Sequence, residues 1–311
     1  MPRITYEKLT VTPKKGQMDF LRRASPIDIH TTTIHTQRNL GEAEPDERSH
    51  TLFQMGMGNE GARVRRTTAS RLGAAGIQGL TLVDALPFWQ AEPDQESLRA
   101  FASYVTDAVA LHLHEKHDLD TLHAIGESQG SVPILENMRQ PDTLLNGRLG
   151  LVHPLGLTPD ILTIPRFTGR MLKTAAQNDV EIVGMLVAAH AARRATQDLL
   201  FTRGTQIRSA VGYDGIAPLT EILKSHEAAI FTGEDDVLFP HDETTHSLGK
   251  AGIDGYKYDI GEGAHAAPGT RIGAKLASRA CYWVQNGVLL PQEQTAESPF
   301  QFRRIVPPID Q

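Results

Sequence analysis

The chain has 311 residues, of which 40% are apolar and 22% are charged, with a formal net charge of −6. This length suits one large α/β domain, and the acidic balance gives nucleic-acid binding no electrostatic support. The sequence contains no apolar stretch of about 18 residues that would span a membrane, no signal-peptide core at its N-terminus and one cysteine, which excludes an intrachain disulfide. We therefore expect a cytoplasmic protein.

Hydrophobic periodicity predicts strands and helices in regular alternation. The predicted strands are Ile4–Val11, a stretch that begins at Ile27, Thr51–Met55, Ile77–Val83, Thr121–Gly126, Leu149–Val152, Ala228–Thr232 and Tyr256–Ile260. The predicted helices are Arg63–Ala75, Gln95–Lys116, Gln129–Arg139, His241–Ala251 and Pro268–Asn286. Repeated strand–helix units indicate a mostly parallel sheet with helices on both faces, made mixed by antiparallel N-terminal strands.

One segment interrupts this alternation. Residues 155–225 contain no strong strand pattern, and residues 169–200 carry long helical patterns. We interpret residues 155–225 as a helical cap inserted into a core formed by residues 1–154 and 226–311. Insertions at the carboxyl edge of such sheets usually shape a ligand site, so Met185 in this cap is a candidate substrate contact.

The motif Gly126-Glu127-Ser128-Gln129-Gly130 follows a predicted strand and opens a predicted helix. A serine on a tight strand-to-helix turn needs small neighbours, which the two glycines provide, and its hydroxyl is then exposed. The following amide, that of Gln129, lies at a helix N-terminus, where it can stabilise an oxyanion. This context favours Ser128 as a nucleophile over an ordinary surface serine.

A serine nucleophile needs a base, and the base needs an orienting carboxylate. Asp236 follows the strand at 228–232 and is our first choice for the acid, with the adjacent Asp235 as the alternative. His265 lies in a glycine-rich loop after the strand at 256–260 and is the best candidate for the base. The competing histidines are His123, His153, His241 and His246.

The segments GESQG, GEDDVLFP and GEGAH, with a helical insertion between the first two, resemble the α/β-hydrolase superfamily across roughly residues 50–290. The resemblance implies an eight-stranded, mostly parallel sheet, a cap after the sixth strand and a triad of Ser128, Asp236 and His265. It also implies an oxyanion hole formed by the amide of Gln129 and a second amide in the loop Gly56-Met57-Gly58. Family members often have His-Gly at the start of that loop, whereas this chain has Met55-Gly56, and we assign the second amide to Met57.

The same loop also fits a different class of protein. Residues 56–61, GMGNEG, match the dinucleotide-binding pattern G-x-G-x-x-G, and the next strand ends at Asp84, where an acid would bind ribose hydroxyls. An NAD(P)-binding oxidoreductase is therefore an alternative, although it leaves the three later motifs unexplained. A hydrolase-like fold that binds a ligand without turnover is a further alternative.

The sequence thus predicts a serine hydrolase that cleaves a carboxylic ester or thioester of a small to medium substrate through an acyl-enzyme. An acyltransferase would use the same triad. Phe88 and Trp89 follow a predicted strand near the expected rim of the site and are candidate substrate contacts. We expect a small-molecule acyl substrate, with no cofactor, no metal and no nucleic-acid partner, and the sequence leaves homo-oligomerisation open.

Overall fold

The computed structural model describes the greater part of the sheet and its helices. The described residues are 3–12, 21, 26–35, 48–56, 62–92, 94–158, 170, 173, 212–253, 257–261, 265, 268, 270–288 and 303–304. Three of the predicted site residues fall outside this description: Met57 and Met185 entirely, and Trp89 in its side chain.

A single mixed sheet forms the centre of the molecule, in the order β1-β2-β4-β3-β5-β6-β7-β8-β9. Its strands are β1 (Ile4–Val11), β2 (Ile27–Ile34), β3 (Ser49–Gln54), β4 (Leu80–Val83), β5 (Thr121–Glu127), β6 (Leu149–Val152), β7 (Ala228–Gly233), β8 (Lys257–Gly261) and β9 (Arg303–Arg304). Strands β3 to β8 are parallel to their neighbours within this group, whereas β1, β2 and β9 pair antiparallel. The predicted mixed, mostly parallel sheet is confirmed, with the two-residue β9 added to the eight expected strands.

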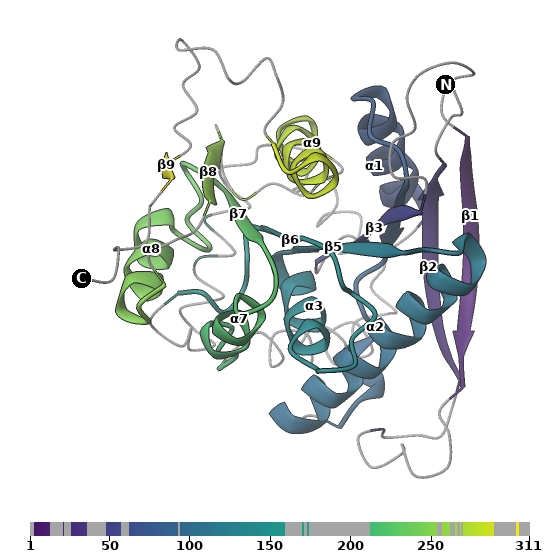
Figure 1. Cartoon of the computed structure of the whole chain (residues 1–311), viewed down its shortest axis with the longest axis horizontal. Coiled ribbons are helices and arrows are strands. Elements are labelled where there is room, and N and C mark those ends of the chain that lie inside the picture. Colours follow the sequence, from purple (N-terminus) through teal and green to yellow (C-terminus); the bar gives the residue numbers. More distant parts are fainter. Residues whose placement is uncertain are drawn as a thin grey trace.

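Helices cover both faces of this sheet (Figure 1). The helices are α1 (Ala62–Ala74), α2 (Gln95–His117), α3 (Ser131–Met138), α7 (Ile216–Ile222), α8 (His241–Lys250) and α9 (Arg271–Asn286). Helices α1 and α9 lie on one face and α2, α3 and α7 on the other, while α8 lies near the end of the sheet that carries β8 and β9 and adds Leu248 to the cluster of the second face. Each face buries its own apolar cluster, one around Phe101 and Leu151 and the other around Phe53 and Trp283.

Helix α7 lies within the segment that we expected to form a cap. It packs against α3, and its side chains Leu219 and Ile222 are buried in the core cluster. The core therefore already includes chain that precedes residue 226. Most of the remaining segment lies outside the described residues, so the cap itself stays a prediction.

The topology brings four loops to one edge of the sheet. Strands β5, β6, β7 and β8 are consecutive neighbours and run parallel, so their carboxyl ends all lie at the same edge. Ser128 directly follows β5 and His153 directly follows β6. Asp236 lies three residues beyond β7 and His265 four residues beyond β8. Residues scattered over 138 positions of sequence thereby reach the same edge of the sheet.

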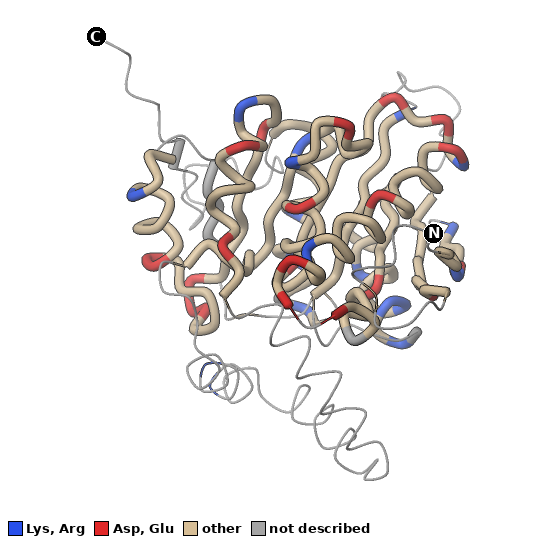
Figure 2. The backbone as a smooth tube through the Cα atoms, turned by 90° about the horizontal axis from the view of Figure 1, so that it is seen from below, with Lys and Arg blue, Asp and Glu red and all other residues tan. Residues whose placement is uncertain are grey.

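Charged residues of both signs are interspersed along the described backbone (Figure 2). Such mixing agrees with the small negative net charge of the whole sequence. Within the described part of the chain, no helix is both long and apolar enough to cross a bilayer.

A cluster of imidazoles lies at the opposite, amino edge of the sheet. The ring of His50 in β3 stacks on that of His117 at the end of α2, with ring centroids 4.9 Å apart. Nε2 of His50 lies 2.9 Å from the hydroxyl of Thr81. Burial, assisted by the charges of His117, His35 and Lys116, lowers the pKa of His50 to about 3. His50 therefore stays neutral in the folded chain.

This burial makes stability depend on pH. Because the unfolded chain takes up a proton at His50 near its ordinary pKa of 6.5 and the folded chain does not, stability is full above that pH and falls as the pH drops toward 3. We expect the stability lost through this residue, once the pH has fallen below both pKa values, to be on the order of 5 kcal/mol. Urea unfolding between pH 5 and 7 should show a smaller pH slope for His50→Gln than for wild type. His246→Gln, at an exposed position, is the control and should keep the wild-type slope; an unchanged slope in His50→Gln would contradict the assignment.

Candidate active site

The Ser128 turn has the strained geometry that its sequence predicts. Ser128 has φ of 52°, in the left-handed region that side chains with a Cβ rarely adopt. A single 3₁₀ turn, Ser128–Gly130, leads from β5 into α3. A Cβ at Gly126 would lie 2.6 Å from Cα of Ser131, and one at Gly130 would collide with the carbonyl of Gln54. Both glycines are therefore required by the close approach of backbone on either side.

Gly56, at the start of the loop that follows β3, lies directly beside this turn. The amide of Gly56 donates a hydrogen bond to Oε2 of the buried Glu127, at 2.6 Å, and a Cβ at Gly56 would lie 2.8 Å from Cβ of Ser128. This is the loop in which the sequence placed a second oxyanion amide, and its first glycine, Gly56, does reach the serine. Met57, the residue to which we assigned that amide, lies outside the described residues, so its role stays a prediction.

Asp236 is held by donors on both of its oxygens. Oδ1 accepts the amides of Leu238 at 2.8 Å and Phe239 at 2.9 Å, and Oδ2 lies 3.0 Å from Nδ1 of His265. Asp236 is 3% exposed, whereas the adjacent Asp235 is exposed to solvent. The geometry therefore selects Asp236 over Asp235 as the partner of His265.

The charges of this pair favour an ionised carboxylate beside a basic imidazole. Burial alone would raise the pKa of Asp236, but the charge of His265 and hydrogen bonds from two histidines hold it well below its ordinary value. Burial alone would likewise lower the pKa of His265, yet the charge and hydrogen bond of Asp236, with the charge of Glu127, raise it. Glu127, whose charge adds to this effect, directly precedes Ser128 in the sequence.

The second histidine on Asp236 is His153, which the sequence offered only as a competitor for the base. Its Nδ1 lies 2.7 Å from Oδ2 of Asp236, and its ring centroid lies 4.6 Å from that of His265. Sequence reasoning missed this role, as it missed that of Glu127. The available signal was position, since His153 directly follows a buried strand that neighbours β5 and β7.

Among the described residues, His153, Asp236 and His265 are the one group whose candidate ligand atoms all lie within 4.8 Å of one another. Such spacing suits a metal ion, but it also suits hydrogen bonds. Both imidazole nitrogens approach the same oxygen, Oδ2, while Oδ1 is already held by two backbone amides. Hydrogen bonding accounts for these positions, and we assign no metal to them.

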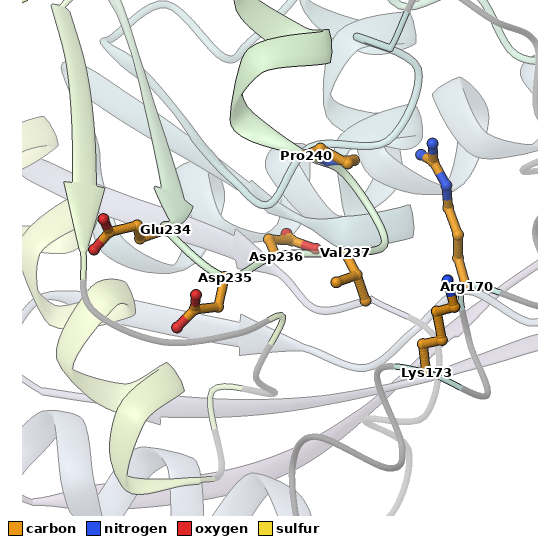
Figure 3. A pocket seen from close by; sticks show the side chains of 7 residues that line it. All are labelled: Arg170, Lys173, Glu234, Asp235, Asp236, Val237 and Pro240. Atoms are coloured by element: carbon orange, nitrogen blue, oxygen red, sulfur yellow. The ribbon is translucent and has the colours of Figure 1, made fainter.

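Next to the acidic turn lies a pocket of about 360 Å³. Figure 3 shows Arg170 and Lys173 across from Asp235 and Asp236. The guanidinium of Arg170 is engaged by Glu243 at 2.6 Å and by the carbonyl of Leu238 at 3.2 Å. Arg170 therefore helps to fix the segment that carries the Asp236 amide donors.

Phe88 is less accessible than its predicted place at the rim of the site suggests. It is 1% exposed and packs against Phe101 in the core, with ring centroids 5.9 Å apart. Phe88 and Gln129 also line a gap that is too narrow for a water molecule. Substrate contact at Phe88 stays a prediction, and its packing in the core is what the structure establishes.

The residues of the dinucleotide-binding alternative have other partners. The carboxylate of Asp84 forms a buried ion pair with Arg65, and the Gly56 amide faces the Glu127 carboxylate. A carboxylate at the first glycine of the loop would repel a pyrophosphate. The described geometry thus favours the hydrolase interpretation over the oxidoreductase one.

Comparison with solved structures agrees with the fold. An esterase from Pyrobaculum calidifontis is 14% identical, with a TM-score of 0.52 over 92% of this chain and 86% of that one. A ferulic acid esterase is 10% identical, with a TM-score of 0.51 over 91% and 98% of the two chains. No family model matches the sequence, and no curated protein matches it either. The chain has the α/β-hydrolase fold.

The strained backbone at Ser128 should lower the stability of any variant that keeps a Cβ at this position. Glycine adopts positive φ without steric cost, whereas alanine keeps the unfavourable Cβ. We expect Ser128→Gly to be more stable than Ser128→Ala by about 1 kcal/mol in urea unfolding. Equal stabilities of the two variants would show that the turn is not strained.

Proposed function

We propose that this chain is a serine hydrolase that cleaves a carboxylic ester or thioester through an acyl-enzyme. The observation that carries the proposal is the arrangement at one sheet edge: a strained serine turn after β5 and a buried Asp236–His265 pair after β7 and β8. The fold is that of proteins described as esterases. Since one fold supports many activities, the side chains carry more weight in this proposal than the fold does.

In the proposed reaction, Oγ of Ser128 attacks the carbonyl carbon while Nε2 of His265 takes its proton. The ionised carboxylate of Asp236 can only accept hydrogen bonds, so Nδ1 of His265 must carry the proton that faces it. This tautomer leaves the Nε2 lone pair available as the base. Asp236 then stabilises the imidazolium that forms.

Collapse of the tetrahedral intermediate breaks the bond to the leaving alcohol or thiol, which takes its proton from His265. Water, deprotonated by His265, then attacks the acyl-enzyme and releases the acid. We assign the oxyanion to the amide of Gln129, at the start of the turn into α3, and to that of Met57. No cofactor enters the proposal.

An acyltransferase would use the same groups and differ only in the nucleophile that accepts the acyl group. The described residues contain no feature that favours an alcohol or amine over water, so hydrolysis is our primary assignment. Product analysis with and without an added alcohol acceptor distinguishes the two.

The nucleophile can be tested directly. A series of short- to medium-chain p-nitrophenyl esters should be hydrolysed by wild type, and a fluorophosphonate should add one mass label to it. Ser128→Ala should lose both, because no other serine lies on the strained turn. Ser131→Ala, at the buried start of α3, is a control that should keep the label. Hydrolysis that survives in Ser128→Ala would overturn the proposal.

The acid can be tested against its neighbour. Asp236→Asn should lower kcat roughly 10³- to 10⁴-fold, because the amide no longer enforces the required tautomer of His265. Asp235→Asn, at the exposed adjacent position, should stay within about twofold of wild type. Equal losses in Asp236→Asn and Asp235→Asn would refute the assignment of the acid.

The wild-type kcat/KM should rise with pH through a value above 6.5, since His265 must be neutral to act as the base and its pKa is raised.

A further inference from the structure

Four observations single out His153. The residue is 1% exposed, and its backbone has φ of 47°, in the left-handed region. Its amide donates to the carbonyl of Phe231 in β7 at 2.8 Å, which ties it to the strand that leads to Asp236. Its ring nitrogen Nδ1 lies closer to Oδ2 of Asp236, at 2.7 Å, than that of His265 does, at 3.0 Å.

The protonation of this ring follows from its partner. An ionised carboxylate has no proton to give, so Nδ1 of His153 must donate. Burial lowers the pKa of His153, against the hydrogen bond and charge of Asp236, which raise it. His153 is therefore a neutral imidazole whose single N–H is directed at the same oxygen as that of His265.

We propose that His153 is a positioning residue for the triad, donating Nδ1–H to Oδ2 of Asp236 and so holding the carboxylate in the plane that His265 requires. This inference rests on the proposed function, since it assigns a role to a neighbour of the proposed acid. It makes Asp236 a carboxylate with four donors: two backbone amides on Oδ1 and two imidazoles on Oδ2.

Sharing Oδ2 between two rings also sets the basicity of His265. Each donor withdraws part of the negative charge that would otherwise stabilise the imidazolium. The titratable groups that act on the His153 ring are Asp236 and His265, and those that act on the His265 ring are Asp236 and Glu127. Without the His153 donor, the whole charge of Oδ2 acts on His265, whose protonated form is then favoured to higher pH.

The contrast between asparagine and leucine at position 153 tests the hydrogen bond. Asparagine carries an N–H donor on the same Cγ position and tolerates left-handed backbone. Leucine fills similar space without a donor. His153→Gly adopts the backbone freely and likewise has no donor, so it replaces His153→Leu in every measurement if the latter does not fold.

We expect His153→Leu to lower kcat roughly 10- to 100-fold with KM within about twofold, because a misplaced carboxylate slows the chemistry and the buried ring does not reach the substrate. The pH at which kcat/KM rises, as His265 loses its proton, should increase by roughly 0.5 to 1 pH unit. His153→Asn should keep most of the wild-type kcat and the wild-type pH dependence of kcat/KM. Wild-type kinetics in His153→Leu, or equal losses in both variants, would overturn the proposal.

A measurement independent of turnover separates this proposal from the proposed function. Proton NMR of the wild type should contain a downfield imidazole N–H resonance from each of His153 and His265, and His153→Leu should lose the first and retain the second. If Ser128→Ala keeps full activity, the proposed function fails, while the two resonances still establish the shared carboxylate. A single resonance in the wild type would refute the role of His153 even in an active hydrolase.

Discussion

The candidate site depends on one buried carboxylate. Asp236 is removed from water, and it stays ionised only because donors surround both of its oxygens. Those donors come from three places: the segment that follows it, the end of β6 and the loop after β8. Each of these elements is oriented by its bond to the same side chain, so loss of this charge would affect all of them together.

The sheet makes this convergence possible. Parallel neighbours must end at the same edge, and β5 through β8 each deliver one polar group there. The helices on the two faces bury separate apolar clusters, and one of these clusters extends to Phe239 beside His265 at this edge. The tight approach of Gly56 to Ser128 and Glu127 adds the loop after β3 to the same group. The relative positions of these polar groups therefore depend on the register of the strands, and core packing away from the site fixes that register.

Patterns that are local in sequence were sufficient to predict most strands and helices and the turn at Ser128. Periodicity located the strands and the helices of the core, and the glycines around Ser128 identified the turn because backbone crowding is encoded within five residues. The sequence favoured Asp236 over Asp235 only by position, and the structure adds the physical reason: Asp236 is buried, whereas the adjacent Asp235 is exposed. The roles of His153 and Glu127 also escaped the sequence, because their partners, Asp236 and Gly56, lie 83 and 71 residues away. Phe88 illustrates the reverse, an aromatic expected at the rim that packs in the core.

Cys281 has a practical consequence that follows from its place in α9. It is the only cysteine in the sequence, it is fully buried, and burial raises the pKa of its thiol, so it is a poor target for thiol-directed reagents. A cysteine introduced at an exposed position would then be the one reactive thiol of the chain. Two such positions would accept a donor and an acceptor dye without any prior removal of native cysteine. Distances within the segment between β6 and α7 thus become accessible to fluorescence in an otherwise unaltered protein.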